Sequence, residues 1–336
     1  MDSRAKVFIQ YVVVIAISVV LIWFSLRGLQ VGEGGNKWGY LVETWHAADK
    51  GWLFIMALVY MVSHCVRAIR WRMLLVPAGQ HTTLNYSFLS VMVGYLVNLV
   101  IPRGGEVSRC YNLYKLDKVP VEISFGTVVL ERIVDLLCLI ILVALSFVLE
   151  SRKLIDFINT LPINTSGSSR IRNMIYVLAL VIVVFLILYW IVKKNKKANN
   201  FLVKIWKGFK GGMLSVFKLE NKGLFIFYSA LIWVLYFFMS YAVIKAFPAT
   251  SVLGFHAVIS LFAIGSIAMA APLPGGTGSY HVLVPQGLVF LYNIDQTDAV
   301  AFTFIFHGWQ TIIVIVVGAI SLLITTFIVK KRSEAD

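Results

Sequence analysis

Long apolar runs dominate the pattern of the chain, and their lengths predict helices that cross a membrane. A helix needs roughly 20 residues, at about 1.5 Å of rise each, to cross a hydrocarbon layer of about 30 Å. Runs of this kind lie at residues 7–26, 52–69, 122–149, 171–192, 223–247 and 299–329. We therefore predict an all-α polytopic membrane protein with about six full spans, forming a single integral membrane domain over residues 1–336.

Two further apolar segments are interrupted by proline and a pair of glycines. Residues 83–101 lead into Pro102-Arg103-Gly104-Gly105, and residues 252–292 are broken at Pro274-Gly275-Gly276. Non-helical backbone at membrane depth is tolerated only where it is buried in protein or lines a wet cavity. We expect each break to belong to a re-entrant helix pair at a polar site. Ordinary kinked helices are the alternative, because proline and glycine are frequent in membrane helices.

Basic residues predict which loops face the cytoplasm. Residues 193–222 carry nine lysines and one acid, so we place this linker inside. Its interleaved aromatic residues predict an amphipathic helix on an anionic membrane surface. A second basic cluster contains Arg67, Arg70 and Arg72. Both clusters lie on one side only if residues 83–101 enter from the cytoplasm and return, rather than crossing.

The same count predicts that the second interrupted segment enters from the opposite side. The basic tail Lys330-Lys331-Arg332 is then cytoplasmic, as is the N-terminus. Residues 1–160 and 171–332 become two halves with the same order of spans and inverted topology. Inverted repeats with broken helices at the midplane are a common construction of secondary transporters.

Composition narrows the class of protein and its partners. Of 336 residues, 59% are hydrophobic and 14% charged, and the formal net charge is +14. Because the basic residues flank apolar runs, the charge indicates anionic lipid rather than nucleic acid. Three scattered cysteines, Cys65, Cys110 and Cys138, provide no metal-ligand spacing. The sequence contains no P-loop, HExxH or GxSxG motif, so we predict no catalytic residues, no metal and no cofactor.

An acidic and basic group lies inside the apolar segment 122–149. Glu131 and Asp135 are four residues apart and share a helix face, and Arg132 can pair with Asp135. Charges at this depth cost at least about 2.5–3.5 kcal/mol, so they should face partners or water. Two roles remain open: an ion-paired clamp to Arg103 or Arg109, and direct contact with a substrate. We assign Glu106 and Asn98 to the same polar network.

The first break combines guanidinium groups with glycines, which suits a phosphate. Arginine donates two parallel hydrogen bonds to such an anion, and glycine lets backbone amides approach it. The candidate phosphate or head-group ligands here are Arg103, Arg109, Gly104, Gly105, Arg67 and Arg70. For the last two, snorkelling to cytoplasmic water is the alternative, and the adjacent Trp71 fits an interfacial anchor.

The second break carries no charge of its own. Gly275 and Gly276 offer amides and Tyr280 offers a hydroxyl to a bound polar group. His281 is the only adjacent titratable side chain, and a lone histidine is more often structural than a proton carrier. We therefore include the two glycines and Tyr280 among the candidate substrate-binding residues, and leave His281 out.

Four motifs, in order along almost the entire chain, resemble the transmembrane, flippase-like domain of lysylphosphatidylglycerol synthases, also known from the multiple peptide resistance factor. They are Arg67-x-x-Arg70-Trp71 with Leu74-Leu75, then Gly94-Tyr95-x-x-Asn98 through Pro102-Arg103-x-Gly105-Glu106-x-x-Arg109, then Glu131-Arg132-x-x-Asp135, and Pro272-x-Pro274-Gly275-Gly276-x-Gly278. The resemblance implies lipid translocation or attachment to a lipid-modifying pathway, in the cytoplasmic, or inner, membrane of a bacterial cell. Where the family often has Glu or a similar polar residue after the last motif, Tyr280-His281 stands here, so no charged role is carried over.

Three functions follow from these observations. The first is ATP-independent, flippase-like or scramblase-like translocation of an anionic phospholipid or a polyprenyl-phosphate lipid. The second is an intramembrane transferase of a lipid-modification pathway, with Glu131 or Glu106 as base, although these 336 residues contain no soluble synthetase domain. The third is a non-catalytic partner of a lipid-modifying enzyme. The sequence leaves the lipid, the driving ion and the oligomeric state open, a homo-oligomer included.

Overall fold

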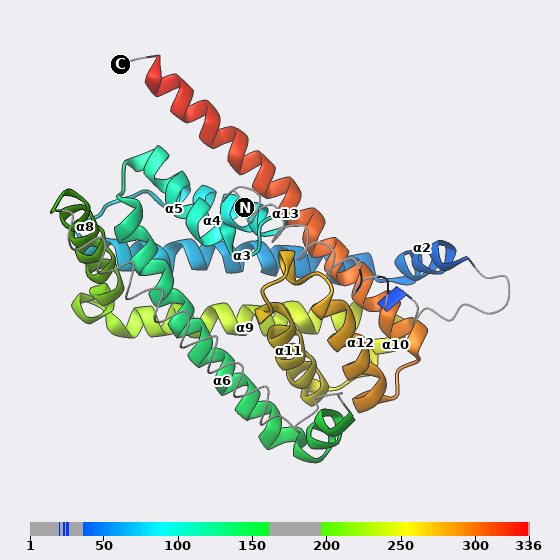
Figure 1. Cartoon of the computed structure of the whole chain (residues 1–336). Helices are drawn as coiled ribbons and strands as arrows, with labels where there is room; N and C mark the ends of the chain where they lie inside the picture. The colour runs from blue at the N-terminus through cyan, green and yellow to red at the C-terminus, as the bar shows by residue number, and fades with distance from the viewer. Residues whose placement is uncertain (1–19, 21–22, 24, 27–35, 161–195, 335–336) are drawn as a thin grey trace, which may run out of the picture.

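The computed structural model describes residues 20, 23, 25–26, 36–160 and 196–334 (Figure 1). Over these residues the chain is helical and contains no strand. The predicted span 171–192 and all but four residues of the predicted span 7–26 lie outside the described part. The helices are α2 (Lys37–Ala47), α3 (Lys50–Leu75), η1 (Val76–Ala78), α4 (Leu84–Asn98), α5 (Gly104–Asp117), α6 (Val121–Thr160), α8 (Lys196–Met213), η2 (Leu214–Lys218), α9 (Lys222–Ala246), α10 (Pro248–Ser251), α11 (Phe255–Ala270), η3 (Pro274–Gly276), α12 (Ser279–Tyr292) and α13 (Gln296–Ser333).

Four of the described helical segments are long and apolar enough to cross a membrane. They are Lys50–Ala78, Val121–Phe157, Lys222–Ala246 and Gln296–Ser333. Each coincides with a span that the apolar runs predict. The chain is therefore an all-α, multi-pass membrane protein, as the sequence predicts.

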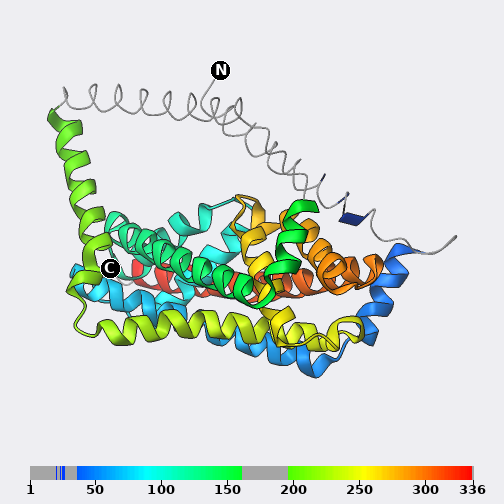
Figure 2. The same cartoon turned by 90° about the horizontal axis from the view of Figure 1, so that it is seen from below.

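Helices α3 and α9 lie side by side along their lengths, on one side of the molecule (Figures 1 and 2). Part of their contact is apolar, with Met56 and Tyr60 of α3 in one core cluster with Met239 and Val243 of α9. The N-cap residue of α3, Asp49, accepts hydrogen bonds from the first turn through its carboxylate. Such caps satisfy amides that a helix start leaves unpaired.

Both interrupted segments form helical hairpins rather than kinked helices. Helices α4 and α5 pack on each other and are joined at a tip over residues 99–103, and α11 and α12 are joined over residues 271–278. In the first hairpin, a Cβ atom on Gly105 would lie 2.1 Å from the carbonyl oxygen of Gly94. Only glycine therefore permits this close approach of α4 and α5.

The two hairpins point in opposite directions along the long helices. At the C-terminal end of α13, Arg332 donates hydrogen bonds to the carbonyl of Leu116 and, at 3.0 Å, to the hydroxyl of Tyr86, at the open end of the first hairpin. The open end of the second hairpin instead lies near the start of α13, where Tyr292 donates to Glu150 of α6. The two hairpins therefore approach each other tip to tip, and the side from which each enters the membrane stays a prediction.

The two halves show the same order of elements. A long helix, a hairpin and another long helix appear as α3, α4–α5 and α6, and again as α9, α11–α12 and α13. The packing is reciprocal, because α4 packs on α13 while α11 packs on α6. An inverted repeat requires this exchange. The division into repeat halves at residues 1–160 and 171–332 itself stays a prediction.

Helix α8 lies across the ends of the long helices (Figure 2). It belongs to the lysine-rich linker, of which residues 196–222 are described. Its glycines fit against the start of α6, since a Cβ atom on Gly212 would lie 2.1 Å from the carbonyl oxygen of Ile123. The helix that the linker sequence predicts is therefore present, and its position on a membrane surface stays a prediction.

Helix α2 contacts α13 at the opposite end of the molecule, outside the spans. The Tyr40 hydroxyl donates to the Asp298 carboxylate. Burial and this carboxylate raise the pKa of Tyr40 well above its ordinary value. The phenol therefore remains a donor throughout the physiological pH range.

Candidate functional site

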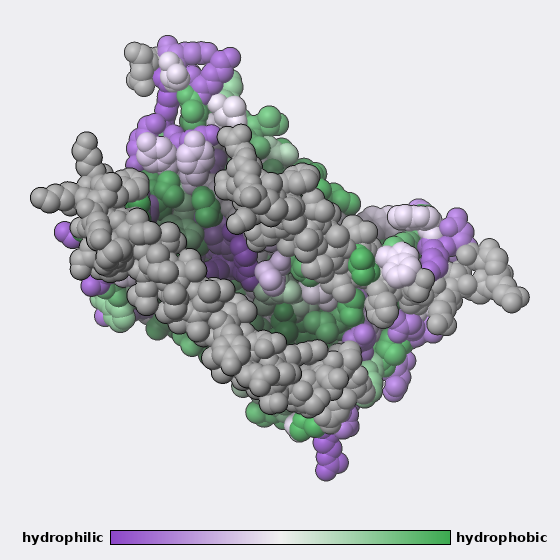
Figure 3. Space-filling view, in the orientation of Figure 1, coloured by the Kyte–Doolittle hydropathy of each residue, from purple (hydrophilic) through white to green (hydrophobic). Residues whose placement is uncertain are grey.

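A cavity of about 520 Å³ lies where the tips of the two hairpins meet. Its walls come from the long helices α3, α6, α9 and α13 and from both hairpins. On the face shown in Figure 3, hydrophilic residues lie recessed within a largely hydrophobic surface. The two breaks, more than 160 residues apart in the sequence, therefore border one site.

Direct contacts join the two tips. Arg103 donates a hydrogen bond of 2.6 Å to the carbonyl of Ala270. A Cβ atom on Gly275 would lie 3.0 Å from a methyl carbon of Leu99. His307 of α13 is hydrogen-bonded through Nε2 to the carbonyl of Gly275, at 3.0 Å. Backbone carbonyls at the second tip are thus satisfied by side chains of the first hairpin and of α13.

Arg103 has an unusual backbone conformation at the first tip. It precedes α5 with φ 60° and ψ 3°, in the left-handed region that residues other than glycine rarely adopt. Backbone strain of this kind persists where the surroundings enforce it, and it concentrates at functional sites. Here it accompanies a side chain that lines the cavity and reaches the opposite hairpin.

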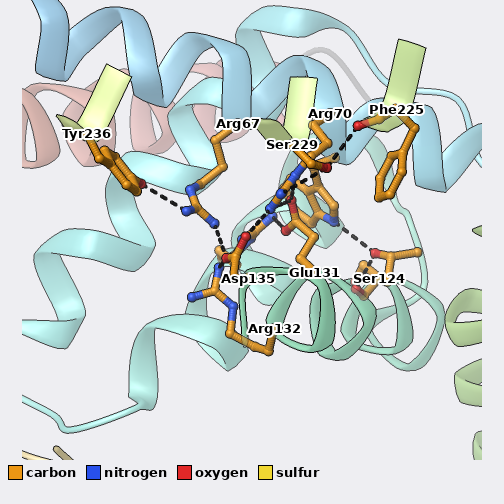
Figure 4. A network of polar contacts seen from close by, with 12 residues as sticks. Arg67, Arg70, Ser124, Glu131, Arg132, Asp135, Phe225, Ser229 and Tyr236 are labelled. Atoms are coloured by element: carbon orange, nitrogen blue, oxygen red, sulfur yellow. Dashed lines mark hydrogen bonds and ion pairs between the residues drawn. The ribbon is translucent and has the colours of Figure 1, made fainter. Parts of the chain in front are cut away.

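An ion-pair network backs the cavity, centred on α6 (Figure 4). Glu131 is completely buried and accepts from Arg70 at 3.2 Å and from Arg109 at 2.7 Å. Arg109 also lies over the ring of Trp71, 3.9 Å from its centroid. Glu131 therefore ties α6 to both α3 and α5, which confirms the predicted clamp to Arg109.

Asp135 is the second carboxylate of the network, one turn further along the same face of α6. It accepts from Arg67 and Arg70, each at 3.0 Å, and from Arg132 at 2.9 Å. Arg67 continues to the hydroxyl of Tyr236 on α9, at 2.9 Å (Figure 4). The pairing of Arg132 with Asp135 is the one that the sequence predicts.

The charges at the site do not balance. The site contains five arginines, at positions 67, 70, 103, 109 and 132, and three carboxylates, at positions 106, 131 and 135. This leaves an excess of two positive charges. A partly desolvated site with this excess favours a bound anion, because a charge in a low-dielectric environment interacts strongly with its neighbours.

The structure contradicts the snorkelling alternative for the arginines of α3. Arg67 and Arg70 are 3% and 0% exposed and are ion-paired inside the protein. Trp71, which fitted an interfacial anchor, is fully buried and donates to Thr127 at 2.9 Å. The physical reason is the position of α6, whose carboxylates provide partners that the α3 sequence does not reveal.

The predicted site residues divide between the cavity wall and the network behind it. Those that line the large cavity are Arg67, Asn98, Arg103, Glu106, Arg132, Asp135, Gly275, Gly276 and Tyr280. Arg70 and Glu131 lie behind the wall, while Gly105 and Arg109 line a smaller adjoining cavity. Gly104 lines neither cavity and belongs to the turn, where its amide donates to the Ile101 carbonyl at 3.0 Å.

The amides of the glycine pairs are largely engaged within the protein. The Gly105 amide donates to the Asn98 side chain at 2.7 Å, and the Gly276 amide donates to the Leu273 carbonyl at 3.1 Å. In this conformation these glycines shape the tips, and the guanidinium groups are the principal donors toward the cavity.

Sequence reasoning missed the aromatic and histidine side chains of the cavity wall. Tyr60, Tyr95, Trp233 and Tyr236 line it, and His307 stacks on the ring of Tyr280 with centroids 5.4 Å apart. Each lies in an apolar helix, where an amphipathic aromatic residue facing lipid produces the same pattern. Among the described residues, no group of three or more His, Cys, Asp or Glu side chains could hold a metal ion.

Long apolar helices and two hairpins of opposite direction around a charged cavity define the class: a multi-pass membrane protein. The sequence profile of the family described as the lysylphosphatidylglycerol synthase TM region matches residues 11–318. The chain belongs to this family, as the four motifs predict.

Two relatives resemble parts of the chain. The UPF0104 membrane protein MJ1595 of Methanocaldococcus jannaschii is 33% identical over 85 residues, which is 24% of each protein. The glycosyltransferase AglD of Haloferax volcanii is 24% identical over 309 residues, which is 82% of this chain and 49% of AglD. The chain thus matches at most about half of either relative's length. No solved structure gives a significant match.

Proposed function

We propose that this protein translocates an anionic lipid, or a lipid-linked phosphate, across the cytoplasmic membrane without hydrolysing ATP. The observation that carries the proposal is the positively charged cavity between the two hairpin tips. Its volume of about 520 Å³ falls within the range of roughly 300–1,000 Å³ that is usual for small-ligand sites. A head group would bind there while its acyl or prenyl chains remain in the bilayer.

The contacts suggest which residues take part. Arg103, Arg132 and Arg67 line the cavity and would bind the phosphate, since guanidinium groups suit its oxygens. Arg70, Arg109 and Glu131 would position α3, α5 and α6 around it. The hairpins would provide alternating access, because broken helices at the midplane recur in carriers of this kind.

Reconstitution into liposomes tests this function. The assay uses phosphatidylglycerol with a fluorophore on its acyl chain. An impermeant quencher abolishes the fluorescence of the lipids in the outer leaflet only, so a loss of fluorescence larger than the outer-leaflet fraction reports translocation. We expect such quenching with the wild type and a loss of about tenfold in rate with Arg103→Gln, because a charge-assisted contact is lost. Arg152→Gln removes an exposed arginine outside the cavity and should leave the rate unchanged. Wild-type liposomes that behave like empty ones would contradict the proposal.

A transferase of a lipid-modification pathway is the second candidate. The name of AglD favours it, and Glu106 lines the cavity as a carboxylate without an ion-pair partner among the described residues. Glu131 is a poor base, because two arginines hold it behind the wall. A covalently changed lipid, detected by mass spectrometry after overexpression and absent with Glu106→Gln, would favour this function over transport.

The remaining assignments are proposals of the same kind. The lysine-rich linker and the C-terminal end of α13 would face the cytoplasm, as would the N-terminus. A lipid-modifying enzyme would act before or after translocation, either as a separate protein or as an associated partner.

A further inference from the structure

One carboxylate at the cavity stands apart from the other two. Glu131 and Asp135 are each ion-paired with at least two arginines. Glu106 forms no ion pair or hydrogen bond among the described residues, and its Oε2 atom is shielded without a partner. A shielded carboxylate oxygen is stabilised when a hydrogen-bond donor reaches it. Its presence indicates a partner that the protein chain does not provide.

The position of Glu106 places this acceptor beside the anion-binding arginines. It lines the large cavity and also a smaller one of about 40 Å³, together with Tyr95, Asn98 and Arg132. The two cavities adjoin through these four shared residues. A group bound to Arg132 in the large cavity therefore has Glu106 within its immediate surroundings.

Arg132 retains donors for a ligand. Its Nη2 atom donates to Asp135, and its side chain is 38% exposed. Arg103 is also exposed to the cavity and uses one donor for the Ala270 carbonyl. The wall thus offers guanidinium donors and a carboxylate acceptor to the same occupant. A phosphate ester whose head group has no hydrogen-bond donor would use only the guanidinium groups and would leave the carboxylate without a partner.

We propose that Glu106 selects lipid head groups that carry a hydroxyl donor next to the phosphate. The inference rests on the proposed translocation and deepens it: the guanidinium groups bind the phosphate, and Glu106 accepts the hydroxyl hydrogen bond. A net anionic polyol phosphate fits better than a zwitterionic head group, because the site has an excess of two positive charges to neutralise. Glu106 is then a specificity-determining residue.

Two lipids of equal charge separate this role from general phosphate binding. Phosphatidylglycerol has hydroxyl donors beside its phosphate, while phosphatidylmethanol has the same charge and none. With the acyl-chain fluorophore and the liposome assay, we expect the wild type to move phosphatidylglycerol about tenfold faster, the effect of one hydrogen bond to a charged acceptor. Phosphatidylethanolamine, a zwitterionic donor, should move more slowly than phosphatidylglycerol.

Two variants connect the preference to Glu106. Glu106→Leu removes the acceptor and should reduce the preference for phosphatidylglycerol over phosphatidylmethanol to about one. The elution profile of the variant on size-exclusion chromatography provides the folding control. Glu106→Gln keeps a neutral acceptor and should give an intermediate preference.

Three outcomes would overturn the inference while leaving translocation intact. They are equal wild-type rates for the two anionic lipids, a preference that survives Glu106→Leu, and a faster rate for phosphatidylethanolamine. If Glu106→Leu slows both anionic lipids equally, Glu106 serves the hairpin structure instead, and the inference is wrong. If the wild type moves none of the three lipids, the proposed function fails together with it.

Discussion

At the scale of single residues, the ion pairs on α6 should contribute unequally to the stability of the protein. Glu131 is completely buried between Arg70 and Arg109, whereas the side chain of Arg132 is 38% exposed. Breaking a buried pair from one side leaves an uncompensated charge and is strongly destabilising, while exposed pairs contribute little. The same helix therefore carries one group required for folding and another free to meet a ligand.

We expect Glu131→Gln to destabilise the protein by about 3 kcal/mol, because two buried guanidinium groups lose their counter-charge. Arg132→Gln should cost less than about 1 kcal/mol, since Asp135 keeps Arg67 and Arg70 as partners. The midpoint of thermal unfolding in detergent, followed by size-exclusion chromatography, compares the two. Equal midpoints for both variants would show that Glu131 is not a structural clamp.

At the scale of elements, glycine contacts decide whether the first hairpin can close. The close approach of α4 and α5 depends on Gly105, where a Cβ atom would also lie 2.5 Å from the Asn98 side chain. Asn98 in turn binds the Gly105 amide and thereby holds the start of α5. The tip that carries Arg103 is thus positioned by contacts within its own hairpin as well as by the opposite one.

Gly105→Ala should therefore disrupt the hairpin, with a loss of about 3 kcal/mol in stability, the upper end of typical overpacking costs. Gly308→Ala in α13 is the matched control. Apart from the backbone of its own helix, no atom lies within 4 Å of a Cβ atom at that position. That change should stabilise the helix by up to about 1 kcal/mol. The yield of monodisperse protein and the unfolding midpoint are compared for the two variants. A Gly105→Ala protein as stable as the wild type would refute the packing argument.

The sequence predicts these elements well where a local rule applies. A proline with two glycines marks both breaks, and the spacing of Glu131 and Asp135 fixes their common face. The sequence does not predict the partners of Arg67 and Arg70, because arginines that snorkel to water and arginines that pair inside the protein give the same pattern on α3. Nor does it distinguish Trp233 or Tyr236, which line the cavity, from aromatic residues that face lipid. Those choices depend on how distant helices pack.

At the scale of the whole molecule, the opposite directions of the hairpins predict opposite accessibility. Lys115 lies on the exposed surface near the open end of the first hairpin, and Val252, 82% exposed, precedes the second. In a variant whose native cysteines are replaced by alanine, Lys115→Cys should react with an impermeant maleimide only from the cytoplasmic side, and Val252→Cys only from the other side. Permeabilised cells provide the control in which both react. Labelling of both from one side would contradict the topology.

The contacts of Arg332 constrain when folding can finish. The carbonyl of Leu116, which it binds, precedes it by 216 positions, so the first hairpin is synthesised long before its final contact exists. The nascent chain must hold the charged first hairpin in the membrane, without this anchor, until its last helix has been inserted. The packing of the first hairpin is therefore completed only when the end of α13 is in place, and a chain that stops before residue 332 lacks the hydrogen bonds of Arg332 to the open end of that hairpin.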